Sequence, residues 1–382
     1  MKSFKYKAFT PNKHTATKLN GCLNLCRELY NSALQERRDA YRVNQVSLNY
    51  YDQANQLSDI KEIREDLQGV HSQVLQDILK RLDKTFKAFY ARVKKGEKAG
   101  FPRFKGENRF DSFCFPQSGW KLESDRLTLS KIGTLRLRLS RQIKGKIKTV
   151  TVKKEIDGWY VIFACETEKE SLEITGESVG IDVGIKTFAK LSNGQEIPNP
   201  KFYRTSEAKL KRAQRKVSRK KKGSNRRRKT VKLLRKQHLK IKRQRLDFLH
   251  KESLKLVRKY DEIAVEDLRI TNMVKNHHLA KSISDASWGN FLNILTAKAE
   301  NAGRAIWKVN AKNTSQDCFA CGEKVPKSLS VRVHHCSNCG IILDRDENAA
   351  KNILKRAVGR TAKDVTYAVG QSVSLRSPIH TL

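Results

Sequence analysis

A long segment of one charge sign sets the first constraint on this fold. Residues 209–245 contain 20 Lys or Arg and no acid, so they must face solvent or a polyanion and cannot form a core. A disordered basic arm is one interpretation. Apolar residues nevertheless recur at helical spacing on both sides of Gly-Ser-Asn at 223–225, which favours a helical hairpin. These apolar residues are Val217, Val231, Leu234, Leu239 and Ile241.

Lysines and arginines of such a hairpin neutralise phosphates without reading bases, so affinity should fall steeply with salt. The predicted phosphate-binding residues around the turn are Lys220, Lys221, Lys222, Arg226, Arg227 and Arg228.

The basic bias extends over the whole chain. Its 79 Lys and Arg against 39 Asp and Glu give a formal net charge of +40, which attracts polyanions. Nucleic acid is the expected partner, and an anionic membrane surface is the alternative. No stretch approaches the roughly 20 apolar residues of a spanning helix, and the N-terminal MKSFKYKAF lacks the apolar core of a signal peptide. We therefore expect a cytoplasmic protein with no membrane partner.

Hydrophobic periodicity divides the N-terminal part of the chain. MKSFKYKAF alternates like a strand, 14–44 and about 70–95 show helical spacing, and the period changes to two between 100 and 170. Because one strand precedes the helices and the others follow them, we expect a β-barrel with a helical domain inserted into it. Cys22 and Cys26 lie one helical turn apart on an apolar stripe and are expected to be core thiols.

Acidic residues occur at unusual places in the C-terminal part. Asp182 lies inside the apolar strand VGIDVGI, and Glu266 ends the apolar run IAV. A lone buried carboxylate is costly, but acids at strand ends commonly face solvent, so neither is diagnostic alone. In DRDENAAKNI, Asp344 precedes Glu347 by three residues, the spacing of a capping box. Asp346 is then left to project from the first helical turn.

Two strand acids and an acid at a helix start can together hold two divalent cations for in-line phosphoryl displacement. Hard oxygen ligands suit Mg²⁺ or Mn²⁺. One cation would activate the attacking water and the other would stabilise the leaving oxygen, with Asp182 placed to bridge both. The predicted catalytic and metal-binding residues are Asp182, Glu266 and Asp346.

Four of the eight cysteines form two C-x-x-C pairs separated by 14 residues. Four thiolates would fill a tetrahedral Zn²⁺ shell, so one zinc ion would be structural and not catalytic. His334 and His335 adjoin the third cysteine, but four sulfurs already suffice. Because the segment ends just before Asp344, it would fix the start of the helix that carries Asp346. The predicted zinc ligands are Cys318, Cys321, Cys336 and Cys339.

Taken in order, these motifs resemble TnpB-type proteins of small bacterial insertion sequences, the compact relatives of type V CRISPR effector nucleases. GIDVGIKTFA, VEDL and DRDENAAKNI are similar to the three RuvC nuclease motifs, and CFACG with HHCSNCG is similar to the zinc ribbon set into that domain. SDASWGNF and GFPRFKG also resemble family sequence.

The resemblance implies a multidomain α+β and α/β fold. The first part would be a wedge-like β-barrel at 1–10 and 96–175, with a helical recognition domain inserted at 11–95. The second would be an RNase H-like RuvC domain at 176–310 and 343–357, which includes the basic hairpin at 205–257. A zinc ribbon at 311–342 would be set into the RuvC domain, and a poorly ordered tail would follow at 358–382.

The resemblance also implies the activity and the partners. A guide RNA from the transposon end would pair with double-stranded target DNA while the protein reads a short flanking motif. Cleavage by Asp182, Glu266 and Asp346 at empty donor sites would favour retention of the element. A monomer bound to RNA, acting on bacterial or archaeal nucleoid DNA, is the favoured form.

Residues that read the flanking motif are harder to identify. Gln73 and Gln76 lie three apart on one helical face, where a Gln can pair with adenine or simply be solvated. Aromatic residues among basic ones could stack on bases, but we expect them to be core residues. They are Phe101, Phe104, Phe113 and Phe115.

Two other functions use the same motifs. The first is a guide-free resolvase or transposase. The long hairpin and the separate barrel argue against it, because they favour a large RNA partner. The second is a protein without nuclease activity, either an RNA-guided repressor or a nucleic-acid-binding protein with a zinc ribbon. The presence of Asp182, Glu266 and Asp346 argues against it.

Overall fold

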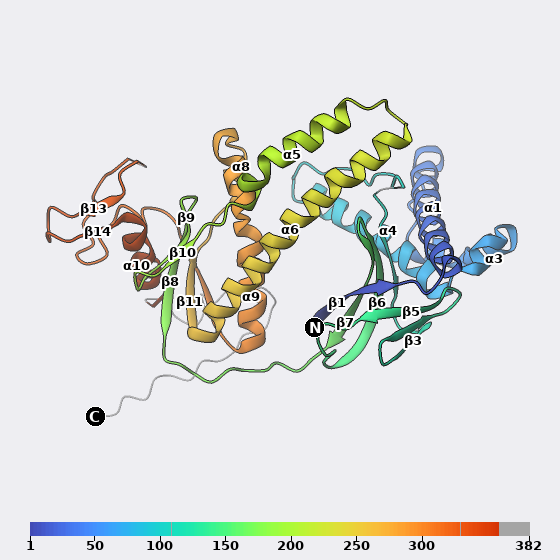
Figure 1. The fold of residues 1–382 in the computed structure, drawn as a ribbon, viewed down its shortest axis with the longest axis horizontal. Coiled ribbons are helices and arrows are strands. Elements are labelled where there is room, and N and C mark those ends of the chain that lie inside the picture. The colour runs from blue at the N-terminus through green and yellow to red at the C-terminus, as the bar shows by residue number, and fades with distance from the viewer. Residues whose placement is uncertain (108, 329, 359–382) are drawn as a thin grey trace. The chain divides into compact units, whose positions relative to one another are not determined.

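The computed structural model forms two compact units, residues 1–168 and the chain from Lys169 onward (Figure 1). It describes residues 1–107, 109–328 and 330–358. The tail expected at 358–382 lies, apart from Val358, outside the described residues. No helix in the described ranges is both long and apolar enough to cross a bilayer.

Seven strands form the antiparallel sheet of the first unit: β1 (Lys2–Phe9), β2 (Ser112–Phe115), β3 (Trp120–Glu123), β4 (Arg126–Leu129), β5 (Gly133–Arg138), β6 (Lys146–Glu155) and β7 (Gly158–Glu166). Their order is β2-β6-β7-β1-β5-β4-β3. The N-terminal strand β1 thus lies inside the sheet, although all its neighbours follow the helices. Among the described residues β2 and β3 are the two ends of this order, so the sheet expected to form a β-barrel is nearly but not fully closed.

Helices fill the segment between β1 and β2: α1 (Lys13–Asn44), α2 (Tyr50–Asn55), α3 (Leu57–Ile63), a 3₁₀ turn (Glu65–Gly69) and α4 (Ser72–Lys94). Asn12 caps α1 by accepting a hydrogen bond from the Thr15 N–H at 2.8 Å. Cys22 and Cys26 are buried against α4 and the sheet, which confirms them as core thiols.

The predicted aromatic core residues of the first unit divide into two pairs. Phe113 and Phe115 on β2 are buried, as expected. The prediction is wrong for Phe101 and Phe104, which are 48% and 43% exposed. Both precede β2 in an irregular segment, so the alternation that buries strand residues does not apply to them.

The second unit contains a five-stranded sheet made of β8 (Ser178–Val183), β9 (Thr187–Leu191), β10 (Glu196–Pro198), β11 (Glu262–Glu266) and β12 (Ala305–Val309). The order is β10-β9-β8-β11-β12. β11 is parallel to both β8 and β12, and parallel neighbours need long crossover connections. Helices supply them: α5 (Phe202–Ser218), α6 (Asn225–Lys259), α7 (Ile270–Met273), α8 (His277–Ala286) and α9 (Trp288–Ala302).

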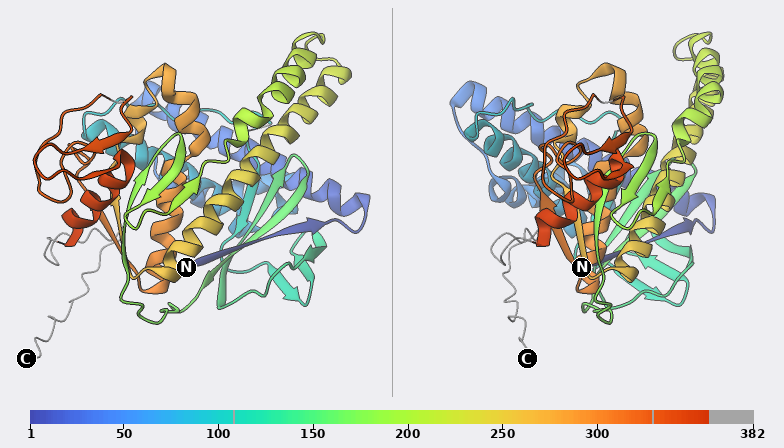
Figure 2. Two further views of the ribbon diagram at one scale, coloured as in Figure 1. Left: turned by 60° about the vertical axis from the view of Figure 1, so that its left-hand side comes forward. Right: turned by 90° about the vertical axis from the view of Figure 1, so that its left-hand side faces the viewer.

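Helices cover both faces of this sheet (Figure 2). Ile263 and Val265 of β11 point toward α6 and α9, where they join the larger core of the unit. Ala264, between them, packs with Ile353 of α10 (Arg345–Val358) on the opposite face. Alternate residues of β8 and β11 therefore face α10.

The basic segment forms the predicted helical hairpin, with α5 and α6 packed together from Phe202 to Lys259 (Figure 1). The buried Asp285 of α8 anchors its base: its carboxylate accepts hydrogen bonds from the Tyr203 N–H at 2.9 Å and from Arg245 Nη2 at 2.9 Å. The phosphate-binding residues predicted around 220–228 lie at the opposite end, mostly exposed.

Gly180 is the point where β8 meets α10. A Cβ atom at this position would lie 2.0 Å from the Ala350 carbonyl oxygen, so the helix would have to move away from the sheet. We expect Gly180→Ala to lower the free energy of unfolding by about 3 kcal/mol in denaturant titrations.

Gly289 in α9 of the same unit provides the matched control. An added Cβ would meet only Ile270 Cδ1, at 3.6 Å, and alanine favours helix by roughly 0.5–1 kcal/mol. Gly289→Ala should therefore leave stability unchanged or raise it. Equal unfolding midpoints for the two variants would refute the close contact at Gly180.

Candidate active site and metal centre

Asp182 and Glu266 lie at the carboxyl ends of two neighbouring parallel strands. Val265 of β11 is aligned with Ile181 of β8, so the next residue of each strand, Glu266 and Asp182, falls at the same level. By strand alternation both side chains are on the face covered by α10. The carboxyl edge of a parallel sheet is also where α/β proteins commonly bind ligands.

The third acid is placed by the start of α10. Asp344 Oδ1 accepts hydrogen bonds from the N–H groups of Asp346 at 2.9 Å and Glu347 at 3.2 Å, which confirms Asp344 as the N-terminal cap. Asp346 thus lies in the first turn of the helix. Its carboxylate pairs with Arg345 Nη2 at 3.0 Å and Arg332 Nη1 at 3.5 Å.

The three predicted acids interact electrostatically. Burial raises the pKa of Asp182 well above its usual range, and the Glu266 and Asp346 carboxylates raise it further, while Arg345 opposes them. Burial also raises the pKa of Glu266, against the effect of Thr314, whose Oγ1 donates to Glu266 Oε1 at 2.6 Å. A divalent cation would relieve this crowding of negative charge.

The carboxylates are neighbours and do not form a closed ligand shell. In the described part of the chain, the one group of three or more His, Cys, Asp or Glu ligand atoms lying within 4.8 Å of one another consists of cysteine sulfurs. Cation binding at the acids would need their side chains to turn together and Asp346 to loosen its arginine contacts.

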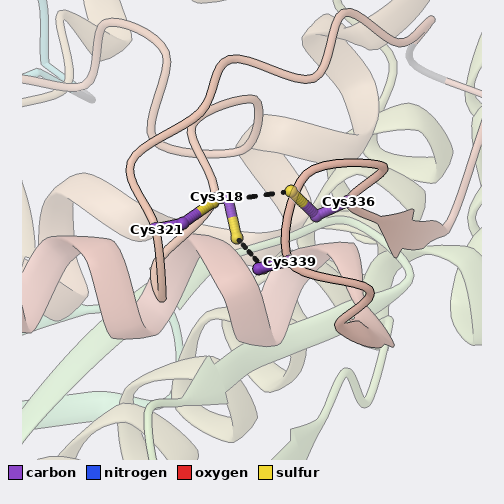
Figure 3. Close-up of side chains that lie close together, drawn as sticks. All are labelled: Cys318, Cys321, Cys336 and Cys339. Atoms are coloured by element: carbon purple, nitrogen blue, oxygen red, sulfur yellow. Dashed lines mark hydrogen bonds between the residues drawn. The ribbon is translucent and has the colours of Figure 1, made fainter.

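Four cysteine sulfurs come together beside α10 (Figure 3). The Cys318–Cys339 and Cys321–Cys336 Sγ pairs are each separated by 3.6 Å, and all four atoms lie within 4.8 Å. A tetrahedral zinc ion with Zn–S bonds of about 2.3 Å separates its sulfurs by about 3.8 Å. The spacing of the cluster therefore fits zinc.

The two cysteine loops are built alike. The Gly322 N–H donates to the Cys318 carbonyl at 2.9 Å, and the Gly340 N–H donates to the Cys336 carbonyl at 2.9 Å. Each glycine has a positive φ, +83° and +72° respectively, which other residues adopt only at a cost. The short hairpin of β13 (Val333–His335) and β14 (Ile342–Asp344) then leads directly to the cap of α10.

Thiol ionisation also favours a cation here. The Glu323 N–H and the Asn338 side chain lower the pKa of the Cys321 thiol to about 6, so its thiolate predominates at neutral pH. For Cys339, the Ile341 N–H favours the thiolate, but burial and the neighbouring sulfurs raise the pKa to about 12. The neighbouring sulfurs thus oppose ionisation of the Cys339 thiol, and a positive ion among them would favour it.

The histidines beside the third cysteine lie outside this sulfur cluster. His334 is buried, and its Nδ1 contacts Lys327 Nζ. His335 is exposed at the end of β13.

Two asparagines of α10 connect the first cysteine loop to the helix of Asp346. Asn352 Nδ2 donates to the carbonyls of Thr314 at 2.9 Å and Asp317 at 2.6 Å. Asn348 Nδ2 donates to the Asp317 carbonyl at 2.8 Å, and its Oδ1 accepts from the Phe319 N–H at 3.1 Å. This role is not among those predicted from the sequence, although two asparagines four residues apart among the alanines of a helix are a usable signal.

Loss of these buried hydrogen bonds should be costly. Asn352→Ala leaves the Thr314 carbonyl without its donor, and we expect a loss of about 2 kcal/mol in the free energy of unfolding. The control is the same change at an exposed asparagine of α9, Asn293→Ala, which should change stability by less than about 0.5 kcal/mol. Equal losses in chemical denaturation would argue against the connection.

Two family models match the second unit, and the first of them begins in β7 of the first unit. The family described as "Probable transposase" (OrfB_IS605) matches residues 162–277, and the Cas12f1-like TNB domain matches residues 288–353.

Relatives match over nearly the full length. A protein of Streptomyces pristinaespiralis named "Putative RNA-guided DNA endonuclease" is 35% identical, over 94% of this chain and 90% of its own. "Putative RNA-guided DNA endonuclease InsQ" of Escherichia coli (strain K12) is 30% identical, over 99% and 96%.

Solved structures share the fold. A Cas12f1–sgRNA–target DNA complex matches with a TM-score of 0.57 at 16% identity, over 90% of this chain and 83% of that one. The mini RNA-guided endonuclease CRISPR-Cas_phi3 matches with a TM-score of 0.56 at 9% identity, over 94% and 92%. At these identities the likeness concerns the fold alone.

Proposed function

This chain belongs to the OrfB_IS605 (TnpB) family, and from that premise we propose that it is an RNA-guided DNA endonuclease of an insertion sequence. The observation that carries the nuclease activity is the meeting of Asp182, Glu266 and Asp346 at one edge of the five-stranded sheet, where the charges of the other two raise the pKa of Asp182. The relatives named as RNA-guided endonucleases support the guide.

In the proposed site the three acids hold Mg²⁺ or Mn²⁺, for which oxygen ligands are suited. Bound there, two such cations would activate water and stabilise the leaving 3′ oxygen of a phosphodiester. Arg332 and Arg345 add positive charge beside Asp346, and this charge favours a phosphate at the same edge. Guide pairing would open the duplex and present single strands to the site.

The four-cysteine cluster is proposed to hold one structural zinc ion. Its role is to position the start of α10, because the loop of Cys318 is hydrogen-bonded to that helix through Asn348 and Asn352.

Recognition of a flanking DNA motif by Gln73 and Gln76 remains a prediction. Gln73 Oε1 accepts hydrogen bonds from the Ser118 N–H at 3.0 Å and its hydroxyl at 3.1 Å. The amide nitrogen of Gln73 donates to Gln117 Oε1 at 3.5 Å, so its second N–H is the group with which it would contact a base.

The tip of the basic hairpin should contribute electrostatic affinity for RNA. Changing Lys220, Lys221, Lys222, Arg226, Arg227 and Arg228 to Gln removes six charges, so the slope of log K against log salt should flatten by up to about 4. Exchanging the same lysines for arginines, and the arginines for lysines, keeps the charge and should keep the slope. A slope unaffected by the Gln variant would remove the tip from the RNA contact.

Sequencing of co-purifying RNA tests the proposed function. The protein is expressed together with its native flanking DNA, isolated, and washed at high salt. We expect one defined RNA that joins element sequence to a foreign 3′ segment. Random fragments, or no RNA, would instead favour a guide-free nuclease that uses the same acids.

A further inference from the structure

A groove opens in the first unit where the packing between α1 and α4 ends. Arg37 of α1 lies at the end of the core that α1 and α4 share. Its Nη1 pairs with Asp83 Oδ1 of α4 at 3.3 Å. Beyond this pair α1 carries arginines on either side of Tyr41, while α4 still carries aromatic residues. The result is a cavity of about 1090 Å³ between the helix ends and the chain following α1.

Aromatic rings line this groove without being covered. Phe101 packs against Phe86 and Phe89 of α4 at centroid distances of 5.6 and 5.4 Å, both nearly perpendicular. Phe101 is nevertheless 48% exposed, Tyr90 is 53% exposed, and Tyr41 on the opposite helix is 57% exposed. So much open ring surface in one groove leaves large flat apolar faces available to a partner.

The groove is also positively charged. Its lining contains four cations, Arg37, Arg38, Arg42 and Lys87, against one acid, Asp83. Asp83 is already paired with Arg37 and, at 2.9 Å, with Lys87. Arg37 lies over the Phe86 ring at 5.2 Å. An occupant must therefore offer flat apolar groups together with negative charge.

Single-stranded nucleic acid has this chemistry, because its bases stack on aromatic rings while its phosphates pair with basic side chains. A second copy of the chain does not, since each copy carries a formal charge of +40 and the lining itself is basic. Gln45 and Ser47 also line the groove, and their side chains can hydrogen-bond a ribose 2′-hydroxyl, which DNA lacks.

We propose that the groove between α1 and α4, lined by Tyr41, Tyr90 and Phe101, stacks unpaired bases of bound RNA. The proposal rests on the proposed function only in taking a guide RNA as the natural source of those bases. Phosphates on either side of the stacked bases would contact Arg38 and Arg42.

The test compares RNA with and without bases, using the full-length chain without Mg²⁺. Fluorescence anisotropy measures binding of a 12-nucleotide RNA, of an abasic chain of the same length, and of DNA of the same sequence. Electrostatic affinity for the backbone cancels in the ratio of RNA to abasic affinity. We expect the combined change Tyr90→Leu and Phe101→Leu to lower that ratio by about tenfold per stacked base and to leave abasic binding unchanged.

Tyr51→Leu is the matched control, because Tyr51 is a 72% exposed aromatic of the same unit outside the groove lining; the ratio should stay as in the wild type. If the double variant fails to fold, Tyr41→Leu tests the opposite wall alone. An unchanged ratio, an equal loss of abasic binding, or equal affinity for DNA and RNA would overturn the proposal. Neither cleavage nor a defined guide enters this measurement, so failure of the nuclease function would not change its result.

Discussion

Replacing Asp182 with asparagine is expected to abolish DNA cleavage while making the protein more stable. Asp182 is the proposed bridging ligand, and its loss should slow cleavage by about 1000-fold or more. Burial together with the Glu266 and Asp346 charges raises the pKa of Asp182 in the folded protein. Above the ordinary carboxyl pKa, the unfolded chain therefore ionises more readily than the folded one, and stability falls as pH rises. A neutral amide removes that penalty.

Thermal unfolding with and without Mg²⁺ distinguishes this account from simple damage to the fold. The wild type should gain stability from Mg²⁺, because the cation binds the folded acids. The Asp182→Asn variant should start from a higher unfolding temperature at neutral pH and gain much less. Asp247→Ala, at an exposed acid in α6 that pairs with Lys251 at 2.8 Å, should behave as the wild type in cleavage and stability. Cleavage retained by Asp182→Asn would show that the site is assigned to the wrong residues.

Removing Cys336, a proposed zinc ligand, is expected to have the second-largest effect. Cys336→Ser should lower the zinc content from one ion per chain to near zero and lower the unfolding temperature of the second unit by about 10 °C, because metal binding contributes to folding free energy. Cleavage should fall with it, since the cysteine loops and Asp344 set the start of α10.

Elemental analysis of the purified protein checks the zinc prediction. Cys114→Ala is the control, because Cys114 is a buried thiol on β2 in the other unit. It should keep one zinc per chain. If Cys336→Ser retained its zinc, or if the wild type contained none, the cluster would not be a zinc site.

Local patterns predicted the local features well. The helical hairpin followed from apolar spacing on both sides of the turn, and the Asp344 cap followed from its distance to Glu347. Both depend on residues a few positions apart, where geometry is set by the backbone period alone.

Features that need distant partners could not be predicted in the same way. The close approach at Gly180 depends on Ala350, 170 residues later. The alignment of Val265 with Ile181 depends on the parallel pairing of β11 with β8, which the hairpin of α5 and α6 separates in the sequence. The exposure of Phe101 has the same cause. Its burial depends on what α1 places opposite it, and there α1 carries Arg38, Tyr41 and Arg42 around an open groove.

The most direct test of the central claim is reprogrammed cleavage. The protein is purified with its RNA and given Mg²⁺ and two DNA molecules, one matching the 3′ segment of the RNA and one matching a substitute segment. The account predicts that replacing that segment moves cleavage from the first DNA to the second, and that Asp182→Asn cuts neither. Cleavage that ignores the RNA, or that persists without it, would contradict an RNA-guided endonuclease.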